Sequence, residues 1–136
     1  MKDVQKWENW EERYAPNAEK VLQNESRLSR LIENVKAKFD KLTRKNKIVR
    51  GVSEILMTYV QLIQSYRRGL YKDFPKKSLL LIIAALIYFV SPLDFIPDLL
   101  PILGYADDAS ILIMVYKSVQ DDLQKFKEWQ RSQVVQ

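Results

Sequence analysis

Apolar residues recur at spacings of three and four along most of this chain, and few segments alternate polar and apolar residues. That period is typical of amphipathic helices that pack through one face. We expect helices over 3–14, 18–43 and 46–72, and a last helix that begins near residue 109. The helix over 46–72 has the clearest amphipathic pattern, and the helix over 18–43 has an apolar row of Leu28, Leu31, Ile32, Val35, Phe39 and Leu42. The pattern predicts an all-α fold.

Residues 79–90 differ from the other segments because they read LLLIIAALIYFV, with the hydroxyl of Tyr88 as their one polar side-chain group. A helix that is apolar on all sides must be buried in protein or in lipid. Twelve residues rise about 18 Å, which is short of the roughly 30 Å hydrocarbon core of a bilayer. An extension to residue 103 would be long enough to span, but each carboxylate that it includes, Asp94 and Asp98, would cost roughly 3 kcal/mol.

The next segment, 91–108, reads SPLDFIPDLLPILGYADD and is explained in large part by capping and turn formation. Its serine, the proline after it and the aspartate three residues after the serine form a variant of the capping box. Two further prolines limit the segment to short helical turns, a glycine can close the turn, and a final aspartate can cap the next helix. The motif residues are Ser91, Pro92, Asp94, Pro97, Asp98, Pro101, Gly104, Asp107 and Asp108.

The same segment also carries a candidate metal site. Asp94 and Asp98 are four residues apart and share one face of a regular helix, and a chain reversal at Gly104 could return Asp107 and Asp108 to them. Four carboxylates could hold Mg²⁺, Ca²⁺ or Mn²⁺, which prefer oxygen ligands. Alternatively, acids beside an apolar hairpin could have raised pKa values and move protons.

Cysteine and histidine are both absent from the chain. Their absence excludes disulfides, thiolate or imidazole metal ligands and every Ser-His or Cys-His relay. Because there is no recognisable catalytic constellation, we expect no enzymatic activity, and no cofactor apart from the divalent cation considered above. The first residues are charged throughout and lack an apolar core, so no cleavable signal peptide is expected.

The formal charge of +5 is unevenly distributed. Eighteen basic and ten acidic residues precede position 79, whereas four basic and seven acidic residues follow it. The basic residues are densest within 36–50, where they face only Asp40: Lys36, Lys38, Lys41, Arg44, Lys45, Lys47 and Arg50. This block predicts an anionic-surface site, or else a solvated helix face. Nucleic acid is disfavoured because the block has only Phe39 as an aromatic and matches no known binding motif.

The motif residues closely resemble the YkvA-like domain of unknown function, whose signature is Ser-Pro-x-Asp-x-x-Pro-Asp followed by Pro-x-x-Gly-x-x-Asp-Asp. Each signature position is matched between Ser91 and Asp108, and the resemblance covers about residues 75–115. The family is described as membrane proteins. The resemblance therefore implies a membrane location, and it implies no substrate, activity or site.

Together these observations predict a helical bundle with a central apolar helical hairpin, joined by a turn rich in proline and aspartate. We expect basic amphipathic helices over 1–72, a YkvA-like hairpin domain over 75–131 and a tail over 132–136. The hairpin would dip into or cross the membrane, and basic residues just before it give the bias of a cytoplasmic flank. Those residues are Arg67, Arg68, Lys72, Lys76 and Lys77.

Three functions are compatible with this organisation. The leading hypothesis is a membrane-associated scaffold, regulator or subunit on the cytoplasmic face of the cell membrane. Its partners would be anionic lipids, and a protein could bind through the amphipathic helices. A second hypothesis is a soluble all-α bundle that binds a protein or an anionic ligand and keeps 79–90 as its buried helix. A third is a metal-dependent hydrolase that uses the aspartate cluster.

Overall fold

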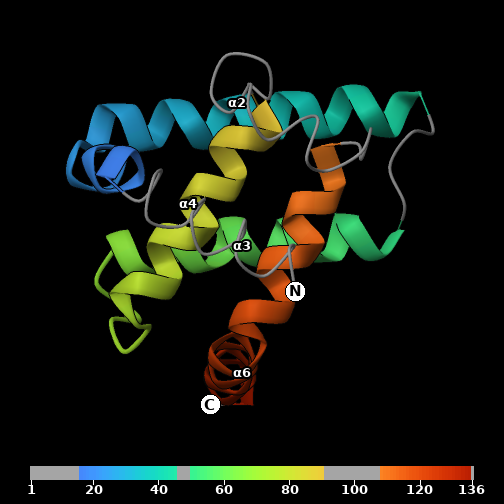
Figure 1. The fold of residues 1–136 in the computed structure, drawn as a ribbon. Coiled ribbons are helices and arrows are strands. Elements are labelled where there is room, and N and C mark those ends of the chain that lie inside the picture. Colours follow the sequence, from blue (N-terminus) through green and yellow to red (C-terminus); the bar gives the residue numbers. More distant parts are fainter. Residues whose placement is uncertain (1–15, 46–49, 91–107, 136) are drawn as a thin grey trace, which may run out of the picture.

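The computed structural model describes residues 16–45, 50–90 and 108–135, most of which are helical (Figure 1). The helices are a segment over 16–23, α2 (Glu25–Arg44), α3 (Arg50–Arg67), α4 (Lys76–Val90) and α6 (Asp108–Val135). Within these ranges there is no β-strand, and the predicted all-α fold is confirmed. The helix expected over 3–14 lies outside the described residues.

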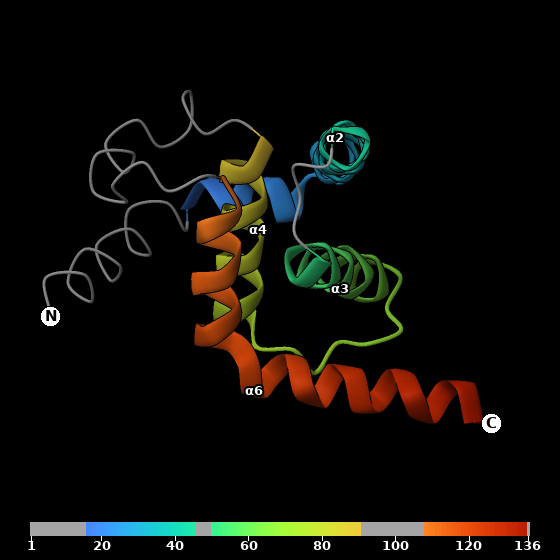
Figure 2. The same ribbon diagram turned by 90° about the vertical axis from the view of Figure 1, so that its right-hand side faces the viewer.

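The helices form two layers that cross steeply. α2 and α3 run in opposite directions and are seen nearly end-on in Figure 2. α4 and the first part of α6 lie side by side in the other layer, also in opposite directions, with α4 packed against both α2 and α6 (Figures 1 and 2). The turn expected to join α4 to α6 lies outside the described residues, so the hairpin itself stays a prediction.

A break at Asn24 divides the helix that was expected to run unbroken over 18–43. The backbone of Asn24 is extended (φ −112°, ψ 106°), and its side chain accepts a hydrogen bond from the Arg27 amide at 3.1 Å. Asparagine in this position is a good N-cap because it satisfies an amide that the first turn leaves without a partner. The apolar period continues on both sides of Asn24, which is why periodicity alone did not reveal the break.

α3 ends earlier than the sequence pattern indicated, at Arg67 instead of near residue 72. Gly69 has a φ of +76°, and the amides of Gly69 and Leu70 donate to the carbonyls of Tyr66 and Ser65 at 3.0 and 2.9 Å. These two bonds define a Schellman motif, which needs a left-handed residue and therefore favours glycine. The motif ends the helix and begins the connection to α4.

α4 contains the apolar segment 79–90, and protein surrounds it. Leu79, Ile82, Ile83, Ala85 and Leu86 are each 0% exposed, and they belong to one hydrophobic core with side chains of α2, α3 and α6. The sequence required that such a helix be buried in protein or lipid, and here its described neighbours are protein. None of the helices described in the structure combines the length and the hydropathy that crossing a bilayer demands.

α6 changes direction at Val119, where the backbone leaves helical geometry (φ −114°, ψ 17°). Just before this point the Ser118 hydroxyl donates to the Met114 carbonyl at 3.2 Å, a local bond that often accompanies a bend. Figure 2 shows the first arm of α6 beside α4 and the second arm turning away beneath α3. The second arm is helical as far as Val135, so most of the tail expected over 132–136 continues the helix.

The second arm of α6 is held by an aromatic cluster. Tyr71, from the connection between α3 and α4, lies 5.2 Å from Phe126 and 5.1 Å from Trp129, measured between ring centroids. Phe126 and Trp129 are themselves 5.9 Å apart. Such pairs add about 0.5–1.5 kcal/mol each beyond the area that they bury. The kink therefore allows one helix to contact α4 with its first arm and the α3–α4 connection with its second.

Candidate functional site

The motif predicted to carry any chemistry lies outside the described residues, with the exception of Asp108, which is the first residue of α6. The capping roles assigned to Ser91, Pro92, Asp94, Pro97, Asp98, Pro101, Gly104, Asp107 and Asp108 therefore stay predictions. The same is true of the metal site assigned to the four aspartates. Among the residues that the structure does describe, no three acidic side chains are grouped in a way that could hold a metal ion.

The basic block that was expected to bind an anionic surface divides between two sides of α2. Residues 27, 30, 34, 38, 41 and 45 follow one another at spacings of three and four and so share one side of the helix. None of them is acidic, and four are exposed cations: Arg27, Arg30, Lys41 and Lys45. We call these four residues the basic side of α2.

Lys36 and Arg44 lie on a different side of the helix. Each is one helical turn from Asp40, and Glu33 is exposed beside them, so acidic groups offset their charge. We call these four residues the acid-bearing side of α2. Lys47 is outside the described residues, and Arg50 is the first residue of α3. The count of basic residues over 36–50 therefore grouped residues from two sides of α2 that differ in charge. It did not include Arg27 and Arg30, which precede that range.

Lys38 is turned toward the protein. Its ammonium group donates a hydrogen bond to the carbonyl of Phe89 in the last turn of α4, and it lies 4.9 Å from the centroid of the Phe89 ring. A cation at this end of a helix neutralises carbonyls that have no intrahelical partner and opposes the negative end of the helix dipole. Lys38 therefore fixes the end of α4 against α2, and it serves the fold.

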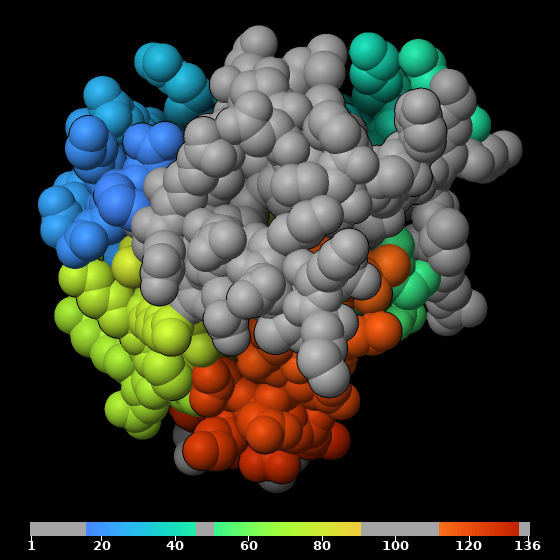
Figure 3. All heavy atoms as spheres, in the orientation of Figure 1, coloured from blue at the N-terminus to red at the C-terminus, as the bar shows by residue number. Residues whose placement is uncertain are grey.

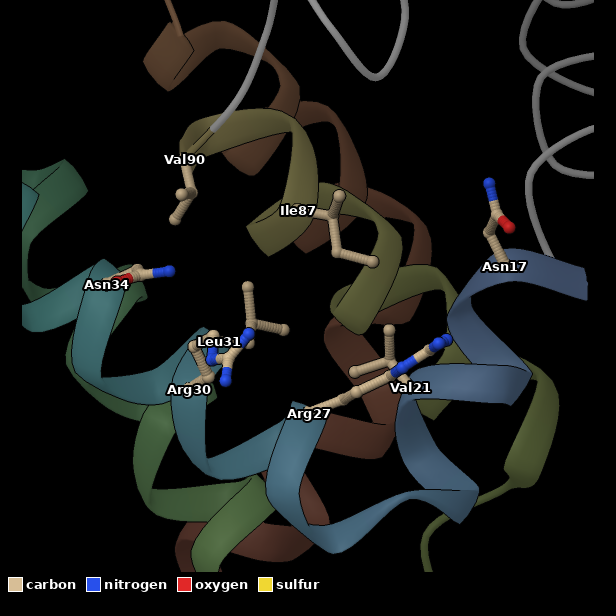
Figure 4. Close-up of a pocket in the computed structure, with 8 residues that line it drawn as sticks. All are labelled: Asn17, Val21, Arg27, Arg30, Leu31, Asn34, Ile87 and Val90. Carbon is tan, nitrogen blue, oxygen red and sulfur yellow. The ribbon is translucent and has the colours of Figure 1, made fainter.

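A groove lies beside this contact. Its volume is about 340 Å³, and its polar lining consists of two side chains of the basic side, Arg27 and Arg30, and two amides, Asn17 and Asn34. Figure 4 shows Arg30 and Asn34 on the α2 side, with Asn17 at the end formed by the segment 16–23. Within the part of the chain that the structure describes, none of the side chains that line the groove is acidic. The polar part of the groove is accordingly a hydrogen-bond donor with a net positive charge.

The rest of the groove is apolar. Ile87 and Val90 line it from the last turns of α4, opposite Val21 and Leu31 (Figure 4). Leu31 is 8% exposed and belongs to the core, whereas Val21, Ile87 and Val90 are only partly buried. Because two arginines stand next to an apolar wall, the groove is suited to a ligand that has an anionic group and a hydrocarbon part.

Two other cations, expected at a membrane flank, also contact neighbouring elements of the fold. Arg67 donates to Glu25 at 2.6 Å and to the Ser29 hydroxyl at 2.7 Å, which joins the end of α3 to the start of α2. Lys76 contacts Glu19 at 2.9 Å, and this hydrogen bond raises the pKa of the Lys76 ammonium. Lys38, Arg67 and Lys76 therefore connect elements of the fold.

No charged residue is buried in the described part of the chain, and its polar core groups have structural tasks. The Tyr59 hydroxyl donates to the Leu112 carbonyl at 2.8 Å, and burial raises the pKa of this phenol, with a smaller contribution from Tyr116. A phenol held neutral in this way is neither a nucleophile nor a base at physiological pH. The Tyr59 phenol therefore has a structural role, in which it joins α3 to α6.

The fold and the groove define an all-α protein with a cationic, amphipathic surface site, and its sequence relatives agree with the resemblance found in the motif. Residues 78–114 match a family described as "Protein of unknown function (DUF1232)". The chain is 35% identical over 88 residues to the "Uncharacterized membrane protein YkvA" of Bacillus subtilis (strain 168). The aligned stretch covers 65% of this chain and 81% of that protein.

This chain belongs to the YkvA-like family of unknown function. No solved structure matches it at a significant level. Of the described residues that line the groove, Ile87 and Val90 fall within the family segment 78–114, and the two arginines come from α2, before that segment.

Proposed function

We propose that this protein is a non-catalytic helical module that attaches to an anionic membrane surface through the basic side of α2. It would act on the cytoplasmic face of the membrane as a scaffold, regulator or subunit. The observation that carries the proposal is the composition of that side: Arg27, Arg30, Lys41 and Lys45 are exposed, and no acid interrupts them. In the space-filling view, parts of the segment 16–45 (blue to teal) form the upper left and upper right edges of the visible face (Figure 3).

The charge of the basic side is sufficient for reversible attachment. Each lysine or arginine near an anionic leaflet contributes about 1 kcal/mol, so four residues contribute roughly 4 kcal/mol. This attraction decreases as salt is added, because the Debye length shortens from about 10 Å at 0.1 M to about 3 Å at 1 M. We therefore expect binding that is peripheral and sensitive to salt.

The position of α4 supports attachment from outside the bilayer. The apolar residues of α4 already have protein neighbours on the sides formed by α2 and α6, so they need no lipid to leave water. The name of the Bacillus subtilis relative, a membrane protein, is compatible with either a peripheral or an integral mode. Peripheral attachment through α2 is thus an alternative to the hairpin that the sequence predicted would enter the bilayer.

Vesicle sedimentation with a matched pair of variants tests the proposal. Vesicles of phosphatidylcholine alone are compared with vesicles that also contain phosphatidylglycerol. Lys41→Glu/Lys45→Glu changes the basic side, and Lys36→Glu/Arg44→Glu makes the same change of net charge on the acid-bearing side. We expect the first variant to weaken binding to the anionic vesicles at least tenfold and the second to weaken it no more than threefold, with both melting as cooperatively as the parent protein.

Two results would contradict the proposal. Equal losses in the two variants would mean that total charge matters and the basic side does not. Retention of the protein in membranes washed with alkaline carbonate would show an integral protein, since peripheral attachment does not survive that treatment. If no anionic vesicle bound the protein at low salt, the soluble binding module would replace the membrane-bound one.

A further inference from the structure

We infer that the groove between α2 and the end of α4 binds a single anionic phospholipid, with the phosphate at Arg27 and Arg30 and an acyl chain along Ile87 and Val90. This inference rests on the proposed membrane attachment and deepens it, because it names the lipid class that the surface selects. Three features of the groove support the inference: its charge, its apolar wall and its position on the molecule.

The charge of the groove fits a phosphate. Arg27 and Arg30 are one helical turn apart on α2, and both line the groove. Guanidinium groups bind phosphate oxygens through two parallel hydrogen bonds, and the amides of Asn17 and Asn34 add further donors. Among the described residues that line the groove there is no carboxylate to compete with an incoming anion.

The apolar wall distinguishes a lipid from a free phosphate. Ile87 and Val90 are partly exposed although they belong to the most apolar helix of the molecule, and Val21 is partly exposed opposite them. A free phosphate would leave these side chains facing water, whereas an acyl chain would cover them at a gain of about 0.8 kcal/mol per buried methylene. The volume of about 340 Å³ accommodates a headgroup with the first part of one chain.

The position of the groove is consistent with access from a membrane. Arg27 and Arg30 belong to the same side of α2 as Lys41 and Lys45, so a bilayer that contacts this side would lie next to the groove. The Lys38 hydrogen bond to the Phe89 carbonyl holds the α4 wall in place before any ligand arrives. A groove that is formed in advance binds with a smaller loss of conformational freedom.

The test uses the full chain and a lipid that stays monomeric in solution. Dihexanoyl-phosphatidylglycerol below its micelle concentration is titrated while methyl and side-chain amide signals are followed by NMR. We expect saturable shifts at Ile87, Val90 and Asn34, and much weaker shifts with dihexanoyl-phosphatidylcholine. Ile87→Trp should fill the groove and reduce lipid affinity at least tenfold. Lys36→Gln, which removes one charge on the acid-bearing side of α2 and outside the groove, should change it less than twofold.

Several outcomes would overturn the inference. One is the absence of saturable shifts with the phosphatidylglycerol probe. Another is unchanged binding by an Ile87→Trp variant that melts normally. Inorganic phosphate giving the same shifts at the same concentration would make this a phosphate site with no lipid selectivity. Shifts that depend on protein concentration and not on lipid would assign the groove to a second copy of this chain.

The lipid titration can fail without the proposed function failing. If the parent protein sediments with anionic vesicles while the monomeric lipid does not bind, the basic side attaches by charge alone, and the groove is not a lipid site. If Ile87→Trp still sediments with vesicles but no longer binds the monomeric lipid, both the proposed function and the inference are supported. Arg30→Gln provides an independent check, because it should weaken monomer binding with little change to the apolar wall.

Discussion

α2 and α4 meet at the end of α4, yet each helix is stabilised in a different way. α4 is apolar from Leu79 to Val90 and most of that stretch is buried in the core, with Ile83 and Leu86 0% exposed. α2 places one row of apolar side chains in the core and exposes two polar sides that differ in charge. Under the proposed function, the helix that meets the membrane is not the most hydrophobic helix of the chain. The amphipathic helix can do so while the apolar one holds the fold together.

The largest expected effect is on α4. Ile83→Ala removes buried methyl groups and leaves a cavity, so we expect the free energy of unfolding to decrease by about 3 kcal/mol. The matched control is Ile113→Ala in α6, where the side chain is 38% exposed and the loss should be less than about 1 kcal/mol. Urea denaturation measures both values. If both variants lost equally little free energy of unfolding, the burial of α4 by protein would be contradicted.

A smaller effect is expected where the two helices are joined. Lys38→Gln shortens the side chain and removes the charge that binds the Phe89 carbonyl, which should cost about 1–2 kcal/mol of stability. Lys41→Gln, one turn along the exposed basic side, should change stability by less than about 0.5 kcal/mol. The same denaturation experiment distinguishes them. If Lys41→Gln were the more costly change, Lys38 would not be the residue that anchors α4.

The smallest expected effect is at the start of α2. Asn24→Ala removes the side-chain oxygen that accepts from the Arg27 amide, and the loss of an N-cap costs about 1 kcal/mol. Ser26→Ala, in the exposed first turn, is the control and should be almost neutral. Thermal denaturation followed by circular dichroism measures both. A neutral Asn24→Ala would mean that α2 and the segment 16–23 do not depend on the cap.

The sequence could predict which side of each helix is buried. Leu28, Leu31, Ile32 and Val35 were expected in one row of α2, and all four are buried, because periodicity records directly which positions avoid water. The same reasoning showed that 79–90 must be enclosed. It could not show by what, since an all-apolar helix has no face that identifies its neighbours. The packing of α4 against α2 and α6 had to come from the structure.

The candidate site was less predictable. Counting basic residues along the chain grouped Lys41 and Lys45 with Lys36 and Arg44, which lie beside acids on another side of α2. Reading charge by helical side would have found Arg27 and Arg30 from the spacing alone. The groove itself joins Asn17 to Ile87 and Val90, which are far apart in sequence, so no local pattern could indicate it. The roles of the four aspartates in 91–108 stay predictions.

The most direct test of the account measures which helix approaches the bilayer. The chain has no cysteine, so single nitroxide labels can be introduced at Lys41→Cys, Lys36→Cys and Leu80→Cys, on the basic side of α2, its acid-bearing side and α4. Electron paramagnetic resonance then compares access of oxygen and of a water-soluble nickel complex before and after anionic vesicles are added.

The account predicts that the label at position 41 loses access to the nickel complex when vesicles are added. The label at position 36 should change less, and the label at position 80 should remain as protected by protein as before. A large gain of oxygen access at position 80, with little change at position 41, would contradict the account. It would place α4 in the hydrocarbon core and leave α2 in water.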